Sequence, residues 1–471
     1  MTIKKFVEKI NHPEIVRLVL PLIVLLEIGR TFYHTNAVYV LSRVLLLYFL
    51  LFAYSEAKKN KQLKVYIVLV LLFGLWALAT TIWSYDPMIT FPRAFYFAYA
   101  AIGASTAGYL WYAYFSKSFL SFLLPANIII VVVSLFSLIT NQPADAWTGG
   151  CGIGFKGFAP HQNVLGMMIL LTIPSVLLPA FSILKLKFKK NYFINFDQIQ
   201  FSLLSTIFYL LLLFLNIYIL ILTQSRGSVM SVLLMVVTFV IFTINWKILI
   251  TTGLTLVLFI AALFLSSPEI KTSVTDYIFK TENTIGDRRS TQINATISAA
   301  KNGGLIGLGY GISDPKNILG DVEEGKRYYR EKMISVLALI EEVGVIGLAF
   351  FLAVIGYVLW LLFSTFKIQS DAAAKTRSSI HSSIHPYETV TLSFACPDFA
   401  GSKGIQHSAF NIRHSLVGLE SAFMIAVLVA LSFDAQIEGW WLGAGSWQFF
   451  LFFSLVGNAL ATEYNIHKSI C

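Results

Sequence analysis

Three arginines in polar surroundings are the residues of this chain best suited to bind an anion. Arg226 stands between Ser225 and Gly227 at the junction of two long apolar runs. Arg288 and Arg289 are adjacent in a polar segment further along. Free amides and the helix dipole favour an anion at a helix start, and guanidinium groups bind phosphate oxygens through paired hydrogen bonds. The pattern predicts a site for a phosphate-bearing group. The alternative for Arg226 alone is a side chain that reaches to the lipid headgroups.

Two glycine-containing stretches accompany these arginines. The first, 152–163, leads into an apolar run; its glycines let backbone approach a ligand closely, and Asn163 is the expected N-cap of the helix that follows. A turn and a cap without chemistry is the alternative. The second, 303–311, could be taken for a phosphate cradle, but no strand is evident before it and no Gly-Lys-Ser/Thr follows, which disfavours a nucleotide site. Between the arginine pair and this run, 293–300 suits a short amphipathic helix on the membrane surface.

The composition places these residues in a membrane protein. Of the 471 residues, 56% are hydrophobic and only 13% are charged, and the mean hydropathy is +0.72. These values are far more apolar than those of a soluble chain of this length. Only helices or a closed barrel satisfy the backbone in lipid, and continuous apolar runs favour helices. We therefore predict an all-α polytopic membrane protein.

About twelve apolar runs are long enough to cross a bilayer as helices. The first follows Lys4, Lys5 and Lys9 without a small-x-small cleavage site, so we expect it to remain as the first span. The predicted spans are 14–30, 36–56, 64–84, 91–115, 119–140, 163–183, 201–223, 228–245, 248–265, 334–366, 416–434 and 446–463.

Basic residues gather in alternate loops, which predicts the orientation of the chain. The loops at 58–64 and 185–190 are rich in lysine, whereas 141–162 and 224–227 carry only Lys156 and Arg226. We expect both termini in the cytoplasm and the polar segment 266–333 outside. Within 266–332, ten Lys/Arg and nine Asp/Glu nearly cancel, which favours a folded loop with short helices over a charged tail. The net charge of +10 thus follows from orientation, and we do not expect a nucleic-acid partner.

The chain divides along these lines. We expect nine spans in 1–265, the extracytoplasmic loop 266–333, a tenth span at 334–366, a cytoplasmic linker at 367–415 and two spans in 416–471. The linker is rich in Ser and His, but the irregular histidine spacing favours a flexible linker over a metal site. The three cysteines, Cys151, Cys396 and Cys471, lie far apart without Cys-x-x-Cys spacing, so we expect no disulfide and no zinc.

The order of the motifs resembles the O-antigen ligase and polymerase superfamily. The resemblance covers roughly residues 150–350 and the layout of about twelve spans. The motifs that carry it are Pro160-x-x-Asn163-x-x-Gly166, Ser225-Arg226-Gly227, Arg289, Gly307-x-Gly309-x-Gly311 and Glu342-x-Gly344-x-x-Gly347. Each is short, and their order and common membrane side make the match specific.

The resemblance implies a glycosyltransferase of the C-type fold in the bacterial cytoplasmic membrane, with its active site facing outward. Such an enzyme takes a glycan from polyprenyl diphosphate and needs no sugar nucleotide, cofactor or metal. Its partners would be the lipid-linked oligosaccharide and membrane lipids, with a flippase and chain-length regulators as further candidates. Arg226 and Arg289 would stabilise the departing diphosphate, with Arg288 as a third candidate.

The sequence also departs from the pattern of the ligases. Ligases of this family usually carry a His-Asn pair some nine residues before the Glu-x-Gly element, where this chain has Met333 and Ile334. This difference resembles the exopolysaccharide polymerase branch and favours polymerisation. A base must take the proton of the acceptor hydroxyl, and Glu342, Glu331 and His161 are the candidates, in that order. Each has a structural alternative, such as an ion pair with Lys332 for Glu331.

Other side chains complete the candidate site. We expect Lys332, His161, Asn163 and Ser225 to contact substrate, and Trp440 and Trp441 to offer aromatic faces to sugar rings, although both tryptophans also suit a membrane-interface belt. A ligase that passes a finished glycan to a lipid or protein is the first alternative function. A flippase for lipid-linked oligosaccharide is the second, and it is disfavoured because no internal repeat is evident.

Overall fold

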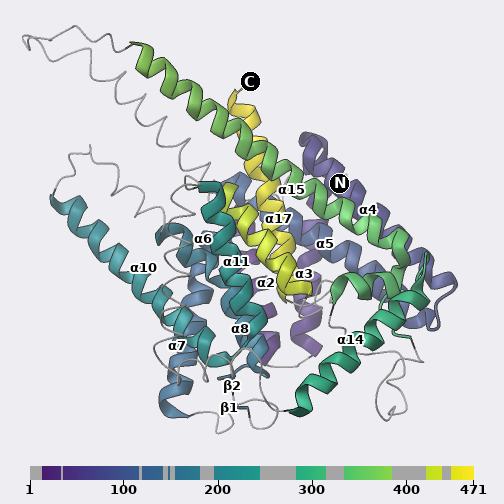
Figure 1. The fold of residues 1–471 in the computed structure, drawn as a ribbon. Coiled ribbons are helices and arrows are strands. Elements are labelled where there is room, and N and C mark those ends of the chain that lie inside the picture. The colour runs from purple at the N-terminus through teal and green to yellow at the C-terminus, as the bar shows by residue number, and fades with distance from the viewer. Residues whose placement is uncertain are drawn as a thin grey trace, which may run out of the picture.

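The computed structural model describes most of the helical part of the chain. The described residues are 13–32, 36–115, 119–141, 147–148, 154–180, 196–243, 283–314, 334–383, 421–436 and 447–470. Within them the structure is almost entirely helical, with one short antiparallel strand pair (Figure 1). The all-α membrane fold expected from composition is confirmed at this level.

The described helices follow one another along the sequence. They are α2 (Pro13–Phe32), α3 (Asn36–Lys59), α4 (Lys61–Ala79), the 3-10 turn η1 (Thr80–Ile82), α5 (Pro87–Phe115), α6 (Phe119–Phe122), α7 (Leu124–Thr140), α8 (Gln162–Thr172), α10 (Phe196–Thr223), α11 (Arg226–Thr243), α14 (Asn283–Gly303), α15 (Ser335–Ser383), α17 (Trp447–Ile470) and an apolar helix at Ser421–Gln436. Strands β1 (Trp147–Thr148) and β2 (Gly154–Phe155) pair so that Trp147 faces Phe155. In Figure 1, α14 and the strands lie at the lower end of the bundle, and the C-terminal ends of α15 and α17 at the upper end.

Six helices are long and apolar enough to cross a membrane among the residues that the structure describes. They are Val40–Lys59, Lys61–Ile82, Gln162–Ala180, Leu204–Thr223, Arg226–Thr243 and Ser335–Lys367, and three shorter apolar helices occupy Leu124–Thr140, Ser421–Gln436 and Gln448–Thr462. The span predicted at 248–265 lies outside the described residues. The total of twelve therefore stays a prediction.

Helices α5 and α17 meet backbone to backbone in the middle of the bundle. A Cβ on Gly108 would stand 1.8 Å from the carbonyl oxygen of Ser454, and one on Gly457 would stand 1.7 Å from that of Ser105. Small residues let helices approach closely in lipid, where dispersion contacts replace the hydrophobic effect between spans. This crossing fixes α5, which carries part of the site described below.

Buried amides tie α7, α8 and α10 together. Asn127 and Asn216 exchange hydrogen bonds of 2.8 and 3.0 Å, and Asn127 also donates to the Thr172 hydroxyl at 2.9 Å. All three side chains are fully buried. Because an unpaired amide would be costly in this setting, the pairing fixes how α8 lies against α7 and α10.

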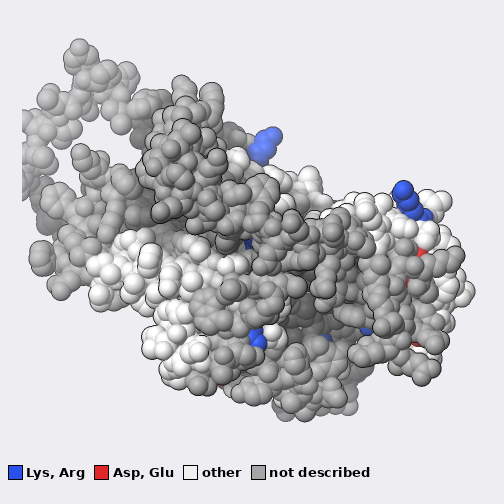
Figure 2. All heavy atoms as spheres, turned by 60° about the horizontal axis from the view of Figure 1, so that its bottom comes forward, with Lys and Arg blue, Asp and Glu red and all other residues white. Residues whose placement is uncertain are grey.

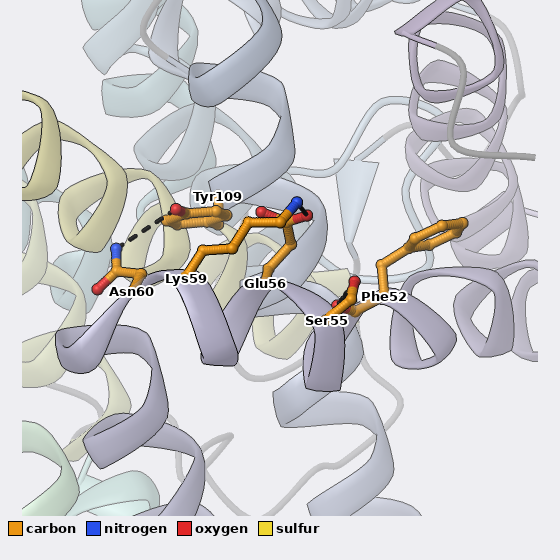
Figure 3. A network of polar contacts seen from close by, with 6 residues as sticks. All are labelled: Phe52, Ser55, Glu56, Lys59, Asn60 and Tyr109. Carbon is orange, nitrogen blue, oxygen red and sulfur yellow. Dashed lines mark hydrogen bonds and ion pairs between the residues drawn. The ribbon is translucent and has the colours of Figure 1, made fainter. Parts of the chain in front are cut away.

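The loop predicted at 58–64 is a tight helix-to-helix turn. Asn60 is the only residue between α3 and α4, and its side-chain oxygen accepts from the backbone N–H groups of Gln62 and Leu63 as an N-cap. Its amide also donates to the Tyr109 hydroxyl at 3.4 Å, and Lys59 pairs with Glu56 at 2.7 Å (Figure 3). The four lysines lie near the ends of α3 and α4, as predicted. The connection between these helices is shorter than the predicted loop 58–64, because Asn60 alone caps α4.

Two helices near the site differ from the prediction. The surface helix expected at 293–300 is much longer, since α14 begins at Asn283 and takes in the Arg288-Arg289 pair. Helix α15 continues to Ser383, so the first part of the predicted linker 367–415 is helical. It also breaks at Gly344, whose φ of 72° is outside the helical region. Neither feature follows from hydropathy, because one is a polar helix and the other interrupts an apolar run without proline.

Candidate functional site

Arg226 is the first residue of α11. Helix α10 ends at Thr223, Gln224 turns the chain with a φ of 54°, and the carbonyl of Ser225 accepts from Val229 N–H at 3.0 Å. Nε and Nη2 of Arg226 are buried atoms, and Ser225 is 1% exposed. The predicted helix start at Ser225-Arg226 is confirmed. The buried nitrogens place the guanidinium within protein and argue against a side chain that only reaches to headgroups.

Helix α8 and strand β2 lie directly against this helix start. A Cβ on Gly166 would stand 2.5 Å from the Cβ of Ser225, and one on Gly154 would stand 2.7 Å from the carbonyl oxygen of Thr223. Ser225 and Ser228 also share a hydroxyl contact of 3.1 Å. Two of the three segments that the sequence singled out therefore lie together. We call this set, Gly154, Gly166, Ser225, Arg226 and Ser228, the arginine corner.

His161, and not Asn163, caps α8. The backbone N–H of Asn163 donates to His161 Nδ1 at 3.2 Å, so the expected N-cap at Asn163 is wrong by two residues. His161 has extended backbone angles, φ −148° and ψ 152°, which a cap residue needs, and Asn163 already lies in the first turn. The His161 side chain is exposed.

The glycine run after α14 binds the broken part of α15. Leu308 and Gly309 donate their N–H groups to the carbonyls of Glu341 and Glu342 at 2.8 and 3.0 Å. Val345 and Ile346 donate theirs to the carbonyls of Gly304 and Leu305 at 3.1 and 3.2 Å. The break at Gly344 frees these groups in α15, and the loop satisfies them. We call the paired segments 303–311 and 341–346 the glycine clasp.

Glycine is required where the two segments touch. Gly307 has a φ of 81°, and a Cβ there would stand 2.3 Å from the carbonyl oxygen of Glu342. Gly311 has a φ of 78°, and its N–H donates to the Glu342 carboxylate at 2.7 Å. The amides of this run are thus occupied by protein acceptors. The run holds backbone and does not form a phosphate cradle.

Three carboxylates are buried beside the clasp. Glu341, Glu342 and Asp314 are 0%, 3% and 3% exposed. Glu341 Oε1 accepts from the N–H of Asp314 at 2.7 Å, and Asp314 Oδ2 accepts from the Asn302 amide at 2.6 Å. We call these three acids the carboxylate corner. Among the residues that the structure describes, no group of three or more metal-binding side chains is placed to hold an ion.

A cation and a phenol face Glu342 from the other side of Gly311. Arg93, near the start of α5, donates from Nη1 to the Gly311 carbonyl at 2.6 Å. The buried ring of Tyr310 packs edge-on against Phe73 and Phe97. Burial raises the pKa of the Tyr310 phenol well above its usual value; the charge of Glu342 raises this pKa further, and that of Arg93 lowers it. Tyr310 therefore stays neutral throughout the physiological range.

The break at Gly344 sets where the carboxylate corner lies relative to the membrane. The apolar helix Ser335–Lys367 is longer than a bilayer requires. Residues 345–367 alone are about 34 Å long at 1.5 Å per residue, which is enough for a hydrocarbon core of about 30 Å. Glu341 and Glu342 then precede the span instead of lying inside it. Figure 2 shows that few charged side chains lie on the described part of the surface in that view.

Sequence reasoning missed Asp434. This fully buried acid lies on the helix Ser421–Gln436, and Ser231 of α11 donates to its Oδ1 at 3.3 Å. The same helix end holds the start of α15, because Ser335 donates to the Ala435 carbonyl at 2.6 Å and Val336 N–H to Gln436 Oε1 at 3.1 Å. An acid within an apolar run is itself a signal of function, and it could have been noticed in the sequence.

Several predicted residues lie beyond what the structure describes. Glu331, Lys332, Trp440 and Trp441 are outside the described residues. Arg288 and Arg289 are described as backbone of α14 only. Arg289 precedes the buried Thr296 by seven residues, or two turns, so the backbone register gives both positions the same face of α14.

Part of the chain matches a known protein family. No curated protein matches the chain. Residues 211–352, however, match the O-antigen ligase family. The matched segment includes Arg226, Arg289, the glycine clasp and Glu342, which come from the elements just described. Residues 211–352 thus carry an O-antigen ligase family domain, and the resemblance of this chain to the O-antigen ligase and polymerase superfamily is confirmed.

Proposed function

We propose that this protein polymerises oligosaccharide repeat units carried on polyprenyl diphosphate, at the extracytoplasmic face of the bacterial cytoplasmic membrane. The acceptor hydroxyl oxygen would attack the anomeric carbon of the donor glycan. The bond from that carbon to the diphosphate oxygen breaks, the polyprenyl diphosphate leaves with the electron pair, and a base takes the hydroxyl proton. The product would be a longer surface polysaccharide on one lipid carrier.

The arginine corner is the observation that carries this proposal. It has an arginine with buried guanidinium nitrogens at the start of α11, next in sequence to Ser225, whose hydroxyl contacts that of Ser228. A helix N-terminus and an arginine both favour the negative charge that develops on a departing diphosphate. Fixed donors stabilise such charge without reorganising during the reaction. Arg226 is therefore our first candidate for this role.

Helix α14 is the candidate source of the second arginine. It packs against α15 and ends in the glycine clasp, where a Cβ on Gly303 would stand 2.3 Å from the Ile340 carbonyl oxygen. Ala295, Thr296, Ala299 and Ala300 form its buried face. The helical register extends that face to the positions of Arg288 and Arg289. We assign Arg289 to the diphosphate on this ground, with Arg288 beside it.

Glu342 is the candidate base, and its surroundings restrict how it could act. Oε2 accepts from the Gly311 N–H at 2.7 Å. A carboxylate bound in this way is held in place, as a general base must be. His161 and Glu331 are the alternatives. Lys332, Asn163, Trp440 and Trp441 remain candidates for contacts with sugar or lipid.

A ligase is the second candidate function. The match to the O-antigen ligase family supports transfer of a lipid-linked glycan and does not separate ligase from polymerase. Met333 and Ile334, at the positions where ligases usually carry the His-Asn pair, favour the polymerase. A flippase stays the third candidate, and the buried arginine at one end of the bundle favours chemistry over transport.

The test is a transfer assay with purified protein in detergent. A polyprenyl-diphosphate-linked oligosaccharide is added, and the products are separated by size on a gel. We expect a ladder from wild type and none from Arg226→Ala or Arg289→Ala. The matched control is Lys301→Ala, which removes an exposed cation from α14 and should keep the ladder.

Other results of this assay would support an alternative function or exclude the proposed role of the arginines. A single product that forms only when an acceptor lipid is supplied would establish a ligase. A normal ladder from both arginine variants would exclude the proposed role of these residues. If wild type transfers no glycan under either condition but moves the lipid-linked oligosaccharide across liposomes, the flippase replaces the polymerase.

A further inference from the structure

Arg93 contacts the site from an element outside the segment that matches the known family. It lies in the second turn of α5, which begins at Pro87, whereas the family match starts at residue 211. Its Nη1 donates to the Gly311 carbonyl at 2.6 Å. A Cβ on Gly311 would stand 2.5 Å from Cδ and 3.0 Å from Nη1 of Arg93. The side chain therefore lies directly against the loop that follows α14.

Gly311 is held by opposite charges at its two ends. Its N–H donates to the Glu342 carboxylate at 2.7 Å, and its carbonyl accepts from the Arg93 guanidinium at 2.6 Å. Charge-assisted hydrogen bonds are shorter and about twice as strong as neutral ones. Arg93 and Glu342 thus act on each other through one residue of the loop. The buried Tyr310 ring next to it feels both charges.

Neutral contacts from α4, from η1 and from Trp83, which follows η1, also support the clasp. Trp76 and Trp83 donate their indole N–H groups to the carbonyls of Val343 and Gly307 at 2.8 and 3.1 Å. The hydroxyl of Thr80 accepts from Tyr310 N–H at 3.0 Å. Among the described contacts of α4, η1 and α5 with the clasp, only that of Arg93 carries a full charge. Loss of the Arg93 contact should therefore weaken the clasp more than loss of one of these neutral contacts.

The surroundings argue against Arg93 as another ligand of the diphosphate. Its Nη1 is committed to a protein carbonyl, and the carboxylate corner of Glu341, Glu342 and Asp314 lies around the same loop. Three buried acids would repel a phosphate group. In the arginine corner, by contrast, the arginine is the first residue of a helix, where the helix dipole favours an anion. The same residue type therefore serves different purposes in the two places.

We propose that Arg93 is a positioning residue for glycan transfer: it fixes the glycine clasp through Gly311, and so holds α14 and Glu342 in place without touching the donor. The proposal rests on the proposed function for its kinetic part. Its structural part does not, because α14 ends at Gly303, where the clasp begins. Loss of Arg93 should let α14 move relative to α5.

The experiment combines kinetics with a distance measurement in the full-length protein. Nitroxide labels are attached at Met88 on α5 and Asn294 on α14, both exposed, after the three native cysteines are changed to serine. Pulsed electron spin resonance then gives the distance distribution. Transfer is measured with the lipid-linked oligosaccharide. The variants are Arg93→Gln and Arg93→Lys, with Trp83→Phe as a neutral clasp variant and Arg17→Gln as a matched exposed arginine.

For Arg93→Gln we expect kcat to fall by about 10- to 100-fold, the range for one lost charged hydrogen bond, with KM within about twofold of wild type. The distance distribution should broaden in the same variant. Arg93→Lys should restore part of kcat and part of the narrow distance distribution, because lysine keeps the charge but lacks the planar guanidinium. Trp83→Phe should have a smaller effect, and Arg17→Gln none.

Other results would overturn the proposal. A raised KM with unchanged kcat and a narrow distance distribution would make Arg93 a substrate ligand. If neither the kinetic constants nor the distance distribution changes, Arg93 has no role in the site. If Arg93→Gln fails to fold, Arg93→Lys decides: a narrow distribution together with wild-type kcat contradicts positioning. If wild type itself transfers no glycan, the proposed function fails, and the distance distributions alone still judge the role of Arg93.

Discussion

The arginine corner and the glycine clasp hold charge in opposite ways. In the arginine corner, small residues such as Gly166 bring α8 within contact of Ser225, and Arg226 begins α11 with buried guanidinium nitrogens. In the clasp, the charged groups of Glu342 and Arg93 form hydrogen bonds with the backbone of Gly311. The first arrangement suits an anionic ligand, and the second fixes the loop that holds the candidate base Glu342. Position in the fold, and not residue type, separates the two roles.

The largest effect is expected at Arg226. Arg226→Ala should lower the rate of glycan transfer by about 10²-fold or more, because a fixed donor to the developing negative charge is lost. Folding should be little changed, since α11 keeps its start at Ser225 and its packing on α8. The rate is measured with a defined lipid-linked oligosaccharide, and folding by size-exclusion chromatography. Arg226→Lys should recover only part of the rate, because an ammonium lacks the bidentate fork. An equal loss of folded protein in Arg226→Ala would instead make the arginine structural.

Glu342 and Glu341 form a natural pair for the next comparison. Both are buried and both accept from the loop after α14, Glu342 from Gly311 and Glu341 from Asp314. Glu342→Gln should lower kcat by about 10²-fold, since a glutamine oxygen can still hold Gly311 but cannot take a proton. Glu341→Gln should keep the rate within a few-fold. The measurement is kcat for both variants side by side. Equal, small losses would show that both acids only hold the loop, and would move the base to Glu331 or His161.

Gly307 tests whether the clasp is needed at all. Gly307→Ala places a Cβ 2.3 Å from the Glu342 carbonyl oxygen and forces alanine into a φ of 81°. The left-handed conformation alone costs about 1–2 kcal/mol, which corresponds to roughly a 10-fold loss of closed clasp. We expect a rate about 10-fold below wild type and faster proteolysis between α14 and α15. Gly356→Ala, where an added Cβ meets nothing within 4 Å, is the matched control on α15. A wild-type rate in Gly307→Ala would mean that the clasp does not bear on transfer.

Sequence reasoning found the arginine corner more readily than the clasp, and the reasons are physical. The start of α11 is local, since Ser225-Arg226-Gly227 carries its own signal between two apolar runs. The break in α15 is not local. Apart from Glu341 and Glu342, 334–366 is a largely apolar run without proline, and Gly344 has its φ of 72° where the loop after α14 supplies hydrogen bonds. Helix α14 is polar along its first half and depends on packing against α15. Arg93 lacked a motif of its own, and its role follows only from contact with Gly311.

The smallest expected effect concerns Tyr310, which lies between the two charges of the clasp. Burial and Glu342 raise its pKa above that of an unfolded tyrosine, about 10, and Arg93 offsets part of this. A raised pKa in the folded state means that the contribution of this group to stability is complete below pH 10 and is lost as the pH rises above it, by up to about 1.4 kcal/mol per pH unit. Tyr310→Phe removes this loss, so the difference in melting temperature between wild type and variant should shift in favour of the variant from pH 9 to pH 11. Thermal unfolding in detergent at both pH values measures it, and lysine titration, common to the two proteins, cancels. If the difference is independent of pH, the phenol already ionises in the folded protein, and the clasp is more open to water than the burial of Tyr310 implies.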